Sequence, residues 1–146
     1  MFKHILISTD GSSLGNKAAK AGIELAHALG AKVTAYYAIE RLQLIYDEGY
    51  MMDQKTIDGL EENARSAGQK RVDAIGKMAK AARVPFTSVV TQASTAYEGI
   101  IDAAKKQKCD VIFMASHGRR GLSKLMMGSV TQKVLAHSKL PVVVYR

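Results

Sequence analysis

The chain has 146 residues, 47% of them hydrophobic, and carries a formal net charge of +8 at neutral pH. This length suffices for one domain with its own core, and no apolar run is long enough to cross a membrane. A lone cysteine, Cys109, excludes an intramolecular disulfide, and the first residues lack the apolar stretch and cleavage site of a signal peptide. We therefore expect a single domain over residues 1–146, located in the cytoplasm.

The positive charge favours an acidic partner. Lysine and arginine residues are spread along the predicted helices, few aromatic residues accompany them, and no nucleic-acid-binding motif occurs. We therefore favour a solvated basic surface over a nucleic-acid interface. A basic surface would equally suit a nucleotide polyphosphate, so charge alone does not choose the partner.

Predicted strands and helices alternate along the chain. Apolar and β-branched runs predict strands at residues 2–9, 32–38, 86–91, 111–115 and 140–145. Apolar residues at helical spacing predict helices from Ser12 or Ser13 to residue 29, over 53–82, around 97–104, and from Ser129 to about 138. Residues 40–50 show neither pattern and are predicted as a loop or mobile flap.

This alternation predicts an α/β fold: a five-stranded parallel sheet with helices on both faces, of the Rossmann-like kind. Ligands of such sheets bind beyond the carboxyl ends of the strands, where the strand order reverses. Residues 9–11, 38–40 and 115–118 follow three of the predicted strands. We expect these three loops to converge on one crevice.

The stretch 111–130 suggests a phosphate site. A buried strand ends in small residues and leads through glycines to a helix start, where backbone N–H groups and the helix dipole attract anions. Gly118, Gly128 and Ser129 are the candidate phosphate-binding residues, and three cations within 119–124 add positive charge. In the alternative interpretation, the glycines only permit turns and Ser129 only caps its helix.

Asp10 directly follows the first predicted strand. Its carboxylate suits ribose hydroxyls or a metal ion, and equally an Asx turn before the next helix. Hydrolytic chemistry has little support, because His117 and Ser116 lack both a nucleophile elbow and a third, orienting residue. The remaining histidines do not have metal-ligand spacing. We therefore assign no catalytic residue and no metal ligand.

The spacing around this loop resembles that of the universal stress protein family, whose pattern is G-x2-G-x9-G-[ST] after the fourth strand. Here it reads Ala115-Ser116-His117-Gly118, nine residues, then Gly128-Ser129. The segments ending the first strand, at 8–12, and the chain, at 140–144, are also similar. The resemblance covers the whole chain and implies one universal stress protein domain with an adenine nucleotide α-hydrolase-like fold.

The resemblance further implies ATP binding, usually with Mg²⁺, and leaves ADP or AMP as alternatives. The residues that correspond to the family's nucleotide site are Asp10 and Thr9 at the adenosine, Ala38 at the adenine, Met114 and Ala115 along the ribose, and Gly118, Gly128, Ser129 and Val130 at the phosphates. One departure is Ala115, where the family has glycine. Its methyl group is tolerated beside the ribose, or narrows the site if the backbone needs a positive φ.

Family members commonly form homodimers by pairing their last strands, here from Pro141 to Tyr145, and an exposed apolar edge strand needs such cover. The implied function is a nucleotide-dependent stress-response or signalling module that is non-catalytic or hydrolyses ATP very slowly. The alternative is a nucleotide-free interaction protein of the same fold that acts through a partner-binding surface. A weaker third interpretation is an enzyme that acts on an adenylate.

Overall fold

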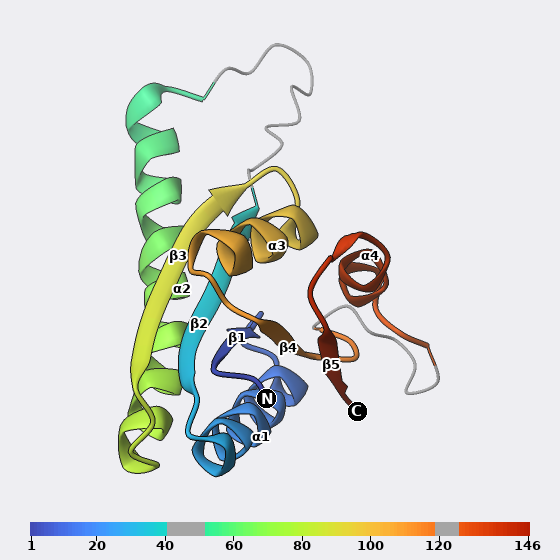
Figure 1. The fold of residues 1–146 in the computed structure, drawn as a ribbon. Coiled ribbons are helices and arrows are strands. Elements are labelled where there is room, and N and C mark those ends of the chain that lie inside the picture. Colours follow the sequence, from blue (N-terminus) through green and yellow to red (C-terminus); the bar gives the residue numbers. More distant parts are fainter. Residues whose placement is uncertain (41–51, 119–125) are drawn as a thin grey trace.

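The computed structural model describes residues 1–40, 52–118 and 126–146. Its elements in chain order are β1 (His4–Ser8), α1 (Ser13–Leu29), β2 (Lys32–Glu40), α2 (Gln54–Ala81), β3 (Phe86–Ala93), α3 (Ala96–Lys106), β4 (Val111–Ala115), α4 (Ser129–His137) and β5 (Val142–Tyr145) (Figure 1). The predicted flap, apart from residue 40, and the three cations within 119–124 lie outside the described residues.

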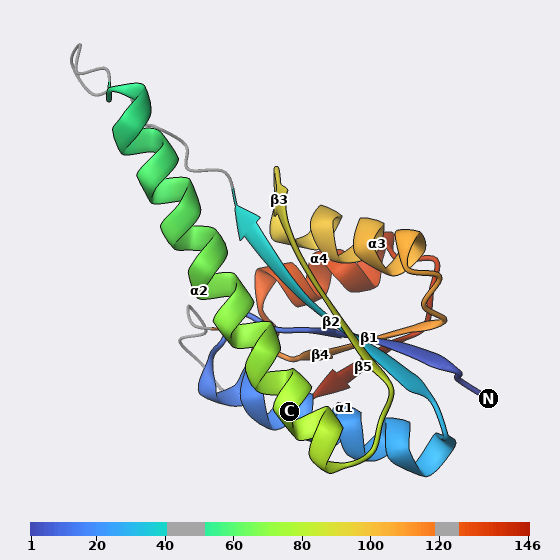
Figure 2. The same cartoon turned by 90° about the vertical axis from the view of Figure 1, so that its left-hand side faces the viewer.

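The five strands form one sheet in the order β3-β2-β1-β4-β5, and every neighbouring pair is parallel. The predicted α/β fold is therefore confirmed. Helices α1 and α2 cover one face of the sheet, and α3 and α4 cover the other (Figure 2). The chain moves outward from β1 to β3 on one side and then returns to place β4 on the other side of β1. The strand order thus reverses between β1 and β4, where a ligand crevice is expected.

Two apolar clusters, one on each face, hold the helices to the sheet. Alternate residues of β1 point to opposite faces: Ile5 and Ile7 join the cluster under α1 and α2, whereas Leu6 joins the one under α3 and α4. All three side chains are fully buried. Burial on both faces explains why the central strands read as continuous apolar runs in the sequence.

The helix ends follow local capping chemistry. The Ser12 side chain accepts a hydrogen bond from the Gly15 N–H at 3.0 Å and caps α1. Gly30 ends the same helix with a φ of 64°, a left-handed conformation that glycine adopts without strain. The expected start of α1 and its expected end are therefore confirmed.

Helix α2 reaches beyond the sheet. Its buried residues begin only at Gly68, and its amino-terminal end extends past the ends of the strands (Figures 1 and 2). Strands β2 and β3 are also longer than predicted, because they stay paired as far as Glu40 and Ala93. Within the described ranges, none of the helices combines the length and apolarity needed to cross a membrane.

Candidate functional site

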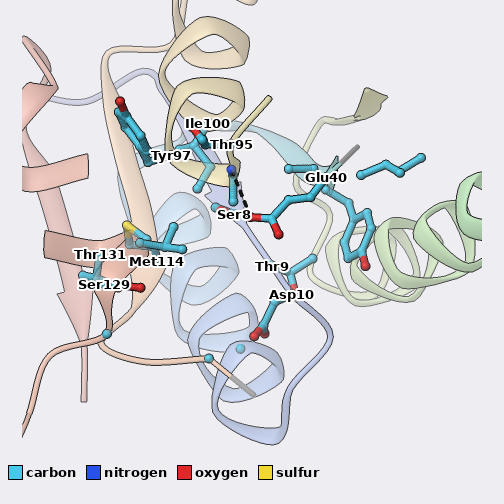
Figure 3. A pocket seen from close by; sticks show the side chains of 18 of the residues that line it. Ser8, Thr9, Asp10, Glu40, Thr95, Tyr97, Ile100, Met114, Ser129 and Thr131 are labelled. Atoms are coloured by element: carbon cyan, nitrogen blue, oxygen red, sulfur yellow. Dashed lines mark hydrogen bonds between the residues drawn. The ribbon is translucent and has the colours of Figure 1, made fainter. Parts of the chain in front are cut away.

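A cavity of about 890 Å³ lies at the carboxyl ends of the strands, and we call it the crevice (Figure 3). Three parts of the chain that are distant in sequence line it: the turn after β1, the end of β2, and the end of β4 together with the start of α4. All nine residues predicted for a nucleotide site contribute to its lining: Thr9, Asp10, Ala38, Met114, Ala115, Gly118, Gly128, Ser129 and Val130. The structure thus brings the predicted loops together.

The turn after β1 presents the Asp10 carboxylate to the crevice. The Thr9 N–H donates to the Tyr36 carbonyl at 3.1 Å, and the Thr9 hydroxyl oxygen accepts the Gly11 N–H at 3.0 Å. Asp10 Oδ1 accepts the Ser12 N–H at 2.9 Å, which is the Asx turn considered from the sequence. The turn therefore holds the carboxylate through Oδ1.

The second carboxylate oxygen, Asp10 Oδ2, lies directly against Gly118. A Cβ atom at Gly118 would overlap that oxygen, whereas Gly118 itself does not have a positive φ. Close approach of the carboxylate, and not a special backbone conformation, is thus the reason for glycine here. The sequence could not distinguish these two reasons.

Ala115 is the last residue of β4, where it pairs with Tyr145 of β5. In the described part of the chain, the only non-glycine residues with positive φ are Arg83 and Lys108. The backbone at Ala115 therefore tolerates a side chain. Its methyl group also packs against the cluster beneath α1 and α2.

Helix α4 starts at the crevice wall. Gly128 is its N-cap residue, and no side chain among the described residues caps the helix. The first N–H groups of a helix have no partner within the helix, and the dipole makes this end positive. The Gly128 N–H donates to the Ser116 carbonyl at 2.8 Å, and the Thr131 hydroxyl donates to the Ala115 carbonyl at 2.9 Å. These two bonds fix the helix start beside the end of β4.

Position 128 also requires glycine because backbone atoms of neighbouring residues lie close to it. A Cβ atom there would come within 3.1 Å of His117 Cα and 3.4 Å of the Ser116 carbonyl oxygen. Ser129, the first helical residue, is exposed and points into the crevice together with Met114 and Asp10 (Figure 3). An anion at this helix start would meet backbone N–H groups and one hydroxyl.

The far wall of the crevice was not predicted as part of the site. Ile57, Leu60 and Ala64 of α2 line it, and their spacing indicates only one apolar face of the predicted helix over 53–82. Leu60 remains 37% exposed. Helical periodicity locates an apolar face but cannot tell whether a sheet or a crevice lies opposite. The apolar residues at the amino-terminal end of α2 face the crevice because this end of the helix extends past the sheet.

Charged side chains of β2, α2 and α4 also line the crevice. Glu40 at the end of β2 accepts the Ala96 N–H at 3.3 Å, and Glu61 lies on α2. The Lys133 ammonium of α4 lies 5.4 Å from the centre of the Tyr97 ring, a cation–π contact. Glu40 belongs to one of the loops predicted to reach the crevice. Glu61 and Lys133 belong neither to those loops nor to the recognised sequence pattern, so sequence reasoning missed these two.

The Ser116 hydroxyl and His117 Nδ1 lie 3.1 Å apart. Ser116 is nevertheless buried at 5% exposure and does not line the crevice. The Ser116 hydroxyl is therefore not presented to the crevice. No group of three or more histidine, cysteine, aspartate or glutamate residues within 1–40, 52–118 and 126–146 is arranged to hold a metal ion.

Comparison with solved structures supports the assignment of the fold. The protein MJ0577 of Methanocaldococcus jannaschii superposes with a TM-score of 0.82 at 23% identity, covering 99% of this chain and 95% of that one. A universal stress protein in complex with cAMP gives 0.73 at 19% identity (99% and 97% covered). A universal stress protein from Archaeoglobus fulgidus in complex with dAMP gives 0.62 at 14% identity (100% and 98% covered). The fold is thus the Rossmann-like, adenine nucleotide α-hydrolase-like fold of these proteins.

The sequence comparisons cover the chain from end to end. Universal stress protein MJ0531 of Methanocaldococcus jannaschii is 29% identical over 146 residues, which span 100% of this chain and 83% of that protein. The model of the universal stress protein family matches residues 1–146. With the parallel sheet and the reversal of strand order between β1 and β4, this match makes the chain a member of the universal stress protein family.

Proposed function

We propose that this protein binds ATP in the crevice and acts in the cytoplasm as a nucleotide-dependent stress-response or signalling module, without catalysis or with very slow hydrolysis. One observation carries the proposal. The Asp10 carboxylate, the Gly118 backbone and the uncapped start of α4 line the same cavity of about 890 Å³. A hydrogen-bond acceptor for a sugar and a donor set for phosphates therefore lie side by side.

The two ends of the ligand would meet different chemistry. Asp10, with Thr9 beside it, would accept hydrogen bonds from the ribose, and Ala38 would offer its backbone to the adenine. Met114 and Ala115 would lie along the ribose. The phosphates would lie at the start of α4, against Gly118, Gly128, Ser129 and Val130. Two structural relatives of this chain form complexes with adenine nucleotides, cAMP and dAMP, which supports this class of ligand.

Magnesium would enter with the nucleotide. Proteins bind Mg²⁺ mostly through one or two side chains together with substrate phosphates and water. The Ser129 hydroxyl and the Asp10 carboxylate line the crevice and are oxygen donors of the kind that Mg²⁺ prefers. When bound, the ion would neutralise phosphate charge.

Titration calorimetry with ATP and Mg²⁺ tests the proposal. We expect saturable binding that Asp10→Ala weakens by about tenfold or more, because a charge-assisted hydrogen bond is lost. Gly128→Val should also weaken it, since its side chain would push against the His117 backbone. Ser88→Ala, exposed on β3 and outside the crevice, serves as the control. Absence of binding at millimolar ATP would overturn the proposal in favour of a nucleotide-free interaction protein.

We also propose that two copies pair through β5. This strand lies at one edge of the sheet, bonded only to β4, and its four residues are apolar or aromatic. An unpaired apolar edge strand is a template for another strand. Pairing of two copies would cover the β5 edge of each copy.

A further inference from the structure

Arg71 of α2 reaches the turn that carries Asp10. It is half-buried and lies next to Val72 on the side of the helix that faces the sheet. Its Nη1 atom donates a hydrogen bond to the Asp10 carbonyl oxygen, and its Cζ atom lies 5.1 Å from the centre of the Tyr37 ring. The guanidinium is therefore held between β2 and the turn after β1.

Gly11 shows that the turn is shaped around this guanidinium. Its φ is +73°, and a Cβ atom there would overlap the Arg71 side chain, 2.7 Å from Cζ and 2.8 Å from Cδ. Position 11 thus needs glycine for its backbone conformation, and a side chain there would also have to displace Arg71. The neighbouring carboxylate is tied to the same turn through the Ser12 N–H.

Lysine could not make the same set of contacts. A guanidinium is planar and carries several donors, so it can lie over an aromatic ring while donating to a carbonyl at its edge. An ammonium on a flexible stem supplies a point charge without that plane. The Tyr37 ring, which Arg71 covers, itself lines the crevice.

We propose that Arg71 is the positioning residue of the crevice: it clamps the main chain at Asp10 and so holds the carboxylate over Gly118, where it meets the sugar of the nucleotide. This inference rests on the proposed ATP binding and adds a residue outside the family's recognised pattern. It makes the nucleoside end of the site depend on α2, an element that shares none of the motif residues.

Hydrogen exchange of the nucleotide-free protein tests the clamp directly. In Arg71→Met, the amides of residues 9–15 should exchange about tenfold faster, because the turn loses its anchor. Arg65→Met removes the same charge from an exposed position of the same helix and should leave these amides unchanged. Unchanged exchange in Arg71→Met would overturn the inference, whatever the protein binds.

ATP titration then tests the consequence through a double-mutant cycle. Arg71→Met should weaken ATP binding about tenfold in the native background. In the Asp10→Asn background it should weaken binding less than about twofold, because the carboxylate that Arg71 positions is then absent. Equal losses in both backgrounds would show that Arg71 acts independently of Asp10 and would overturn the inference.

Arg71→Lys keeps the positive charge and provides a second variant in case Arg71→Met does not fold. It should weaken ATP binding at least about threefold, and unchanged affinity would contradict the clamp. If the native protein binds no ATP, the proposed function fails. The exchange measurement still decides whether Arg71 holds the turn.

Discussion

At the scale of single residues, the crevice depends on two glycines whose neighbours lie too close to leave room for a side chain. Gly118 leaves room for Asp10 Oδ2, and Gly128 leaves room for the backbone at His117. Neither glycine has a positive φ, so a residue with a small side chain would be free of backbone strain at both positions. What such a residue would change is the position of the carboxylate or of the helix start.

We therefore predict that Gly118→Ala weakens ATP binding by about tenfold, since its methyl group must displace the Asp10 carboxylate. The free energy of unfolding should change by less than about 1 kcal/mol, as at other partly exposed sites. Ala115→Gly is the matched variant on the same segment. Its affinity should stay within about twofold, because the strand backbone at Ala115 already accepts a side chain. Calorimetry and denaturant unfolding measure both, and a loss of affinity only in Ala115→Gly would contradict this account.

His4 gives a second residue-scale prediction, far from the crevice. Burial first, and then the Lys32 charge, lower the pKa of His4 below its usual 6.5. Its Nε2 lies 2.8 Å from the Thr34 hydroxyl, and Nδ1 is buried with no hydrogen-bond partner within the described ranges. His4 thus binds a proton more readily in the unfolded chain than in the folded one. Its ionisation therefore leaves the free energy of unfolding unchanged above pH 6.5 and lowers it as the pH drops below 6.5.

The free energy of unfolding can change with pH by at most about 1.4 kcal/mol per pH unit because of this one group. Urea unfolding between pH 7.5 and 5 measures it. In His4→Gln, the part of the slope due to His4 should vanish, leaving the contribution of the other titrating groups. A native protein and a variant with parallel stability curves would contradict the assigned cause.

At the scale of elements, the sequence predicted best what local chemistry determines. The start of α4 at Ser129 and the β4 bounds were predicted correctly, and the predicted start of α1 was narrowed to Ser12 or Ser13, because caps and apolar runs are local signals. The extent of β2 and β3 was underestimated, since it depends on pairing between strands about 50 residues apart. The crevice wall on α2 was missed for the same reason: what faces a helix is a property of the assembled fold.

Helix α4 illustrates how an element is held at the site. Thr131 is 2% exposed, and its hydroxyl donates to the Ala115 carbonyl at 2.9 Å. Thr131→Val keeps the shape but leaves that carbonyl without this donor, so we predict a loss of about 1–2 kcal/mol in stability. ATP affinity should also fall, because the helix start is no longer fixed to β4. Thr131→Ser retains the hydroxyl and should recover most of both quantities in thermal unfolding and calorimetry.

At the scale of the whole molecule, five exposed cations lie at the edge of the sheet opposite the crevice. Lys3, Lys32, Arg83, Lys108 and Lys139 are exposed and lie just before the five strands or at their starts. Parallel strands begin at one edge, so these cations gather opposite the carboxyl ends. Helices end at that edge too, and their dipoles favour cations there. The placement of these five cations therefore has a structural explanation that is independent of any ligand.

Assembly is the last property of the whole molecule that the sheet makes testable. The Ile112 and Ser116 N–H groups donate to the carbonyls of Pro141 and Tyr145, at 3.0 and 2.7 Å. Because backbone groups alternate in direction along a strand, Val143 also faces β4, whereas Val142 and Val144 present theirs to the open edge. A proline at Val143 would consequently break the sheet itself.

Val144→Pro is the sharper variant, because it removes an N–H from the open edge alone, where proline is tolerated. If two copies pair through β5, light scattering should show a dimer for the native chain and a monomer for this variant, at unchanged helix content. Ser88→Pro makes the equivalent change at the opposite edge: the Val33 N–H donates to the Pro85 carbonyl, so Ser88 faces away from β2. That control should keep the native mass. A dimer that survives Val144→Pro but not Ser88→Pro would move the interface to β3.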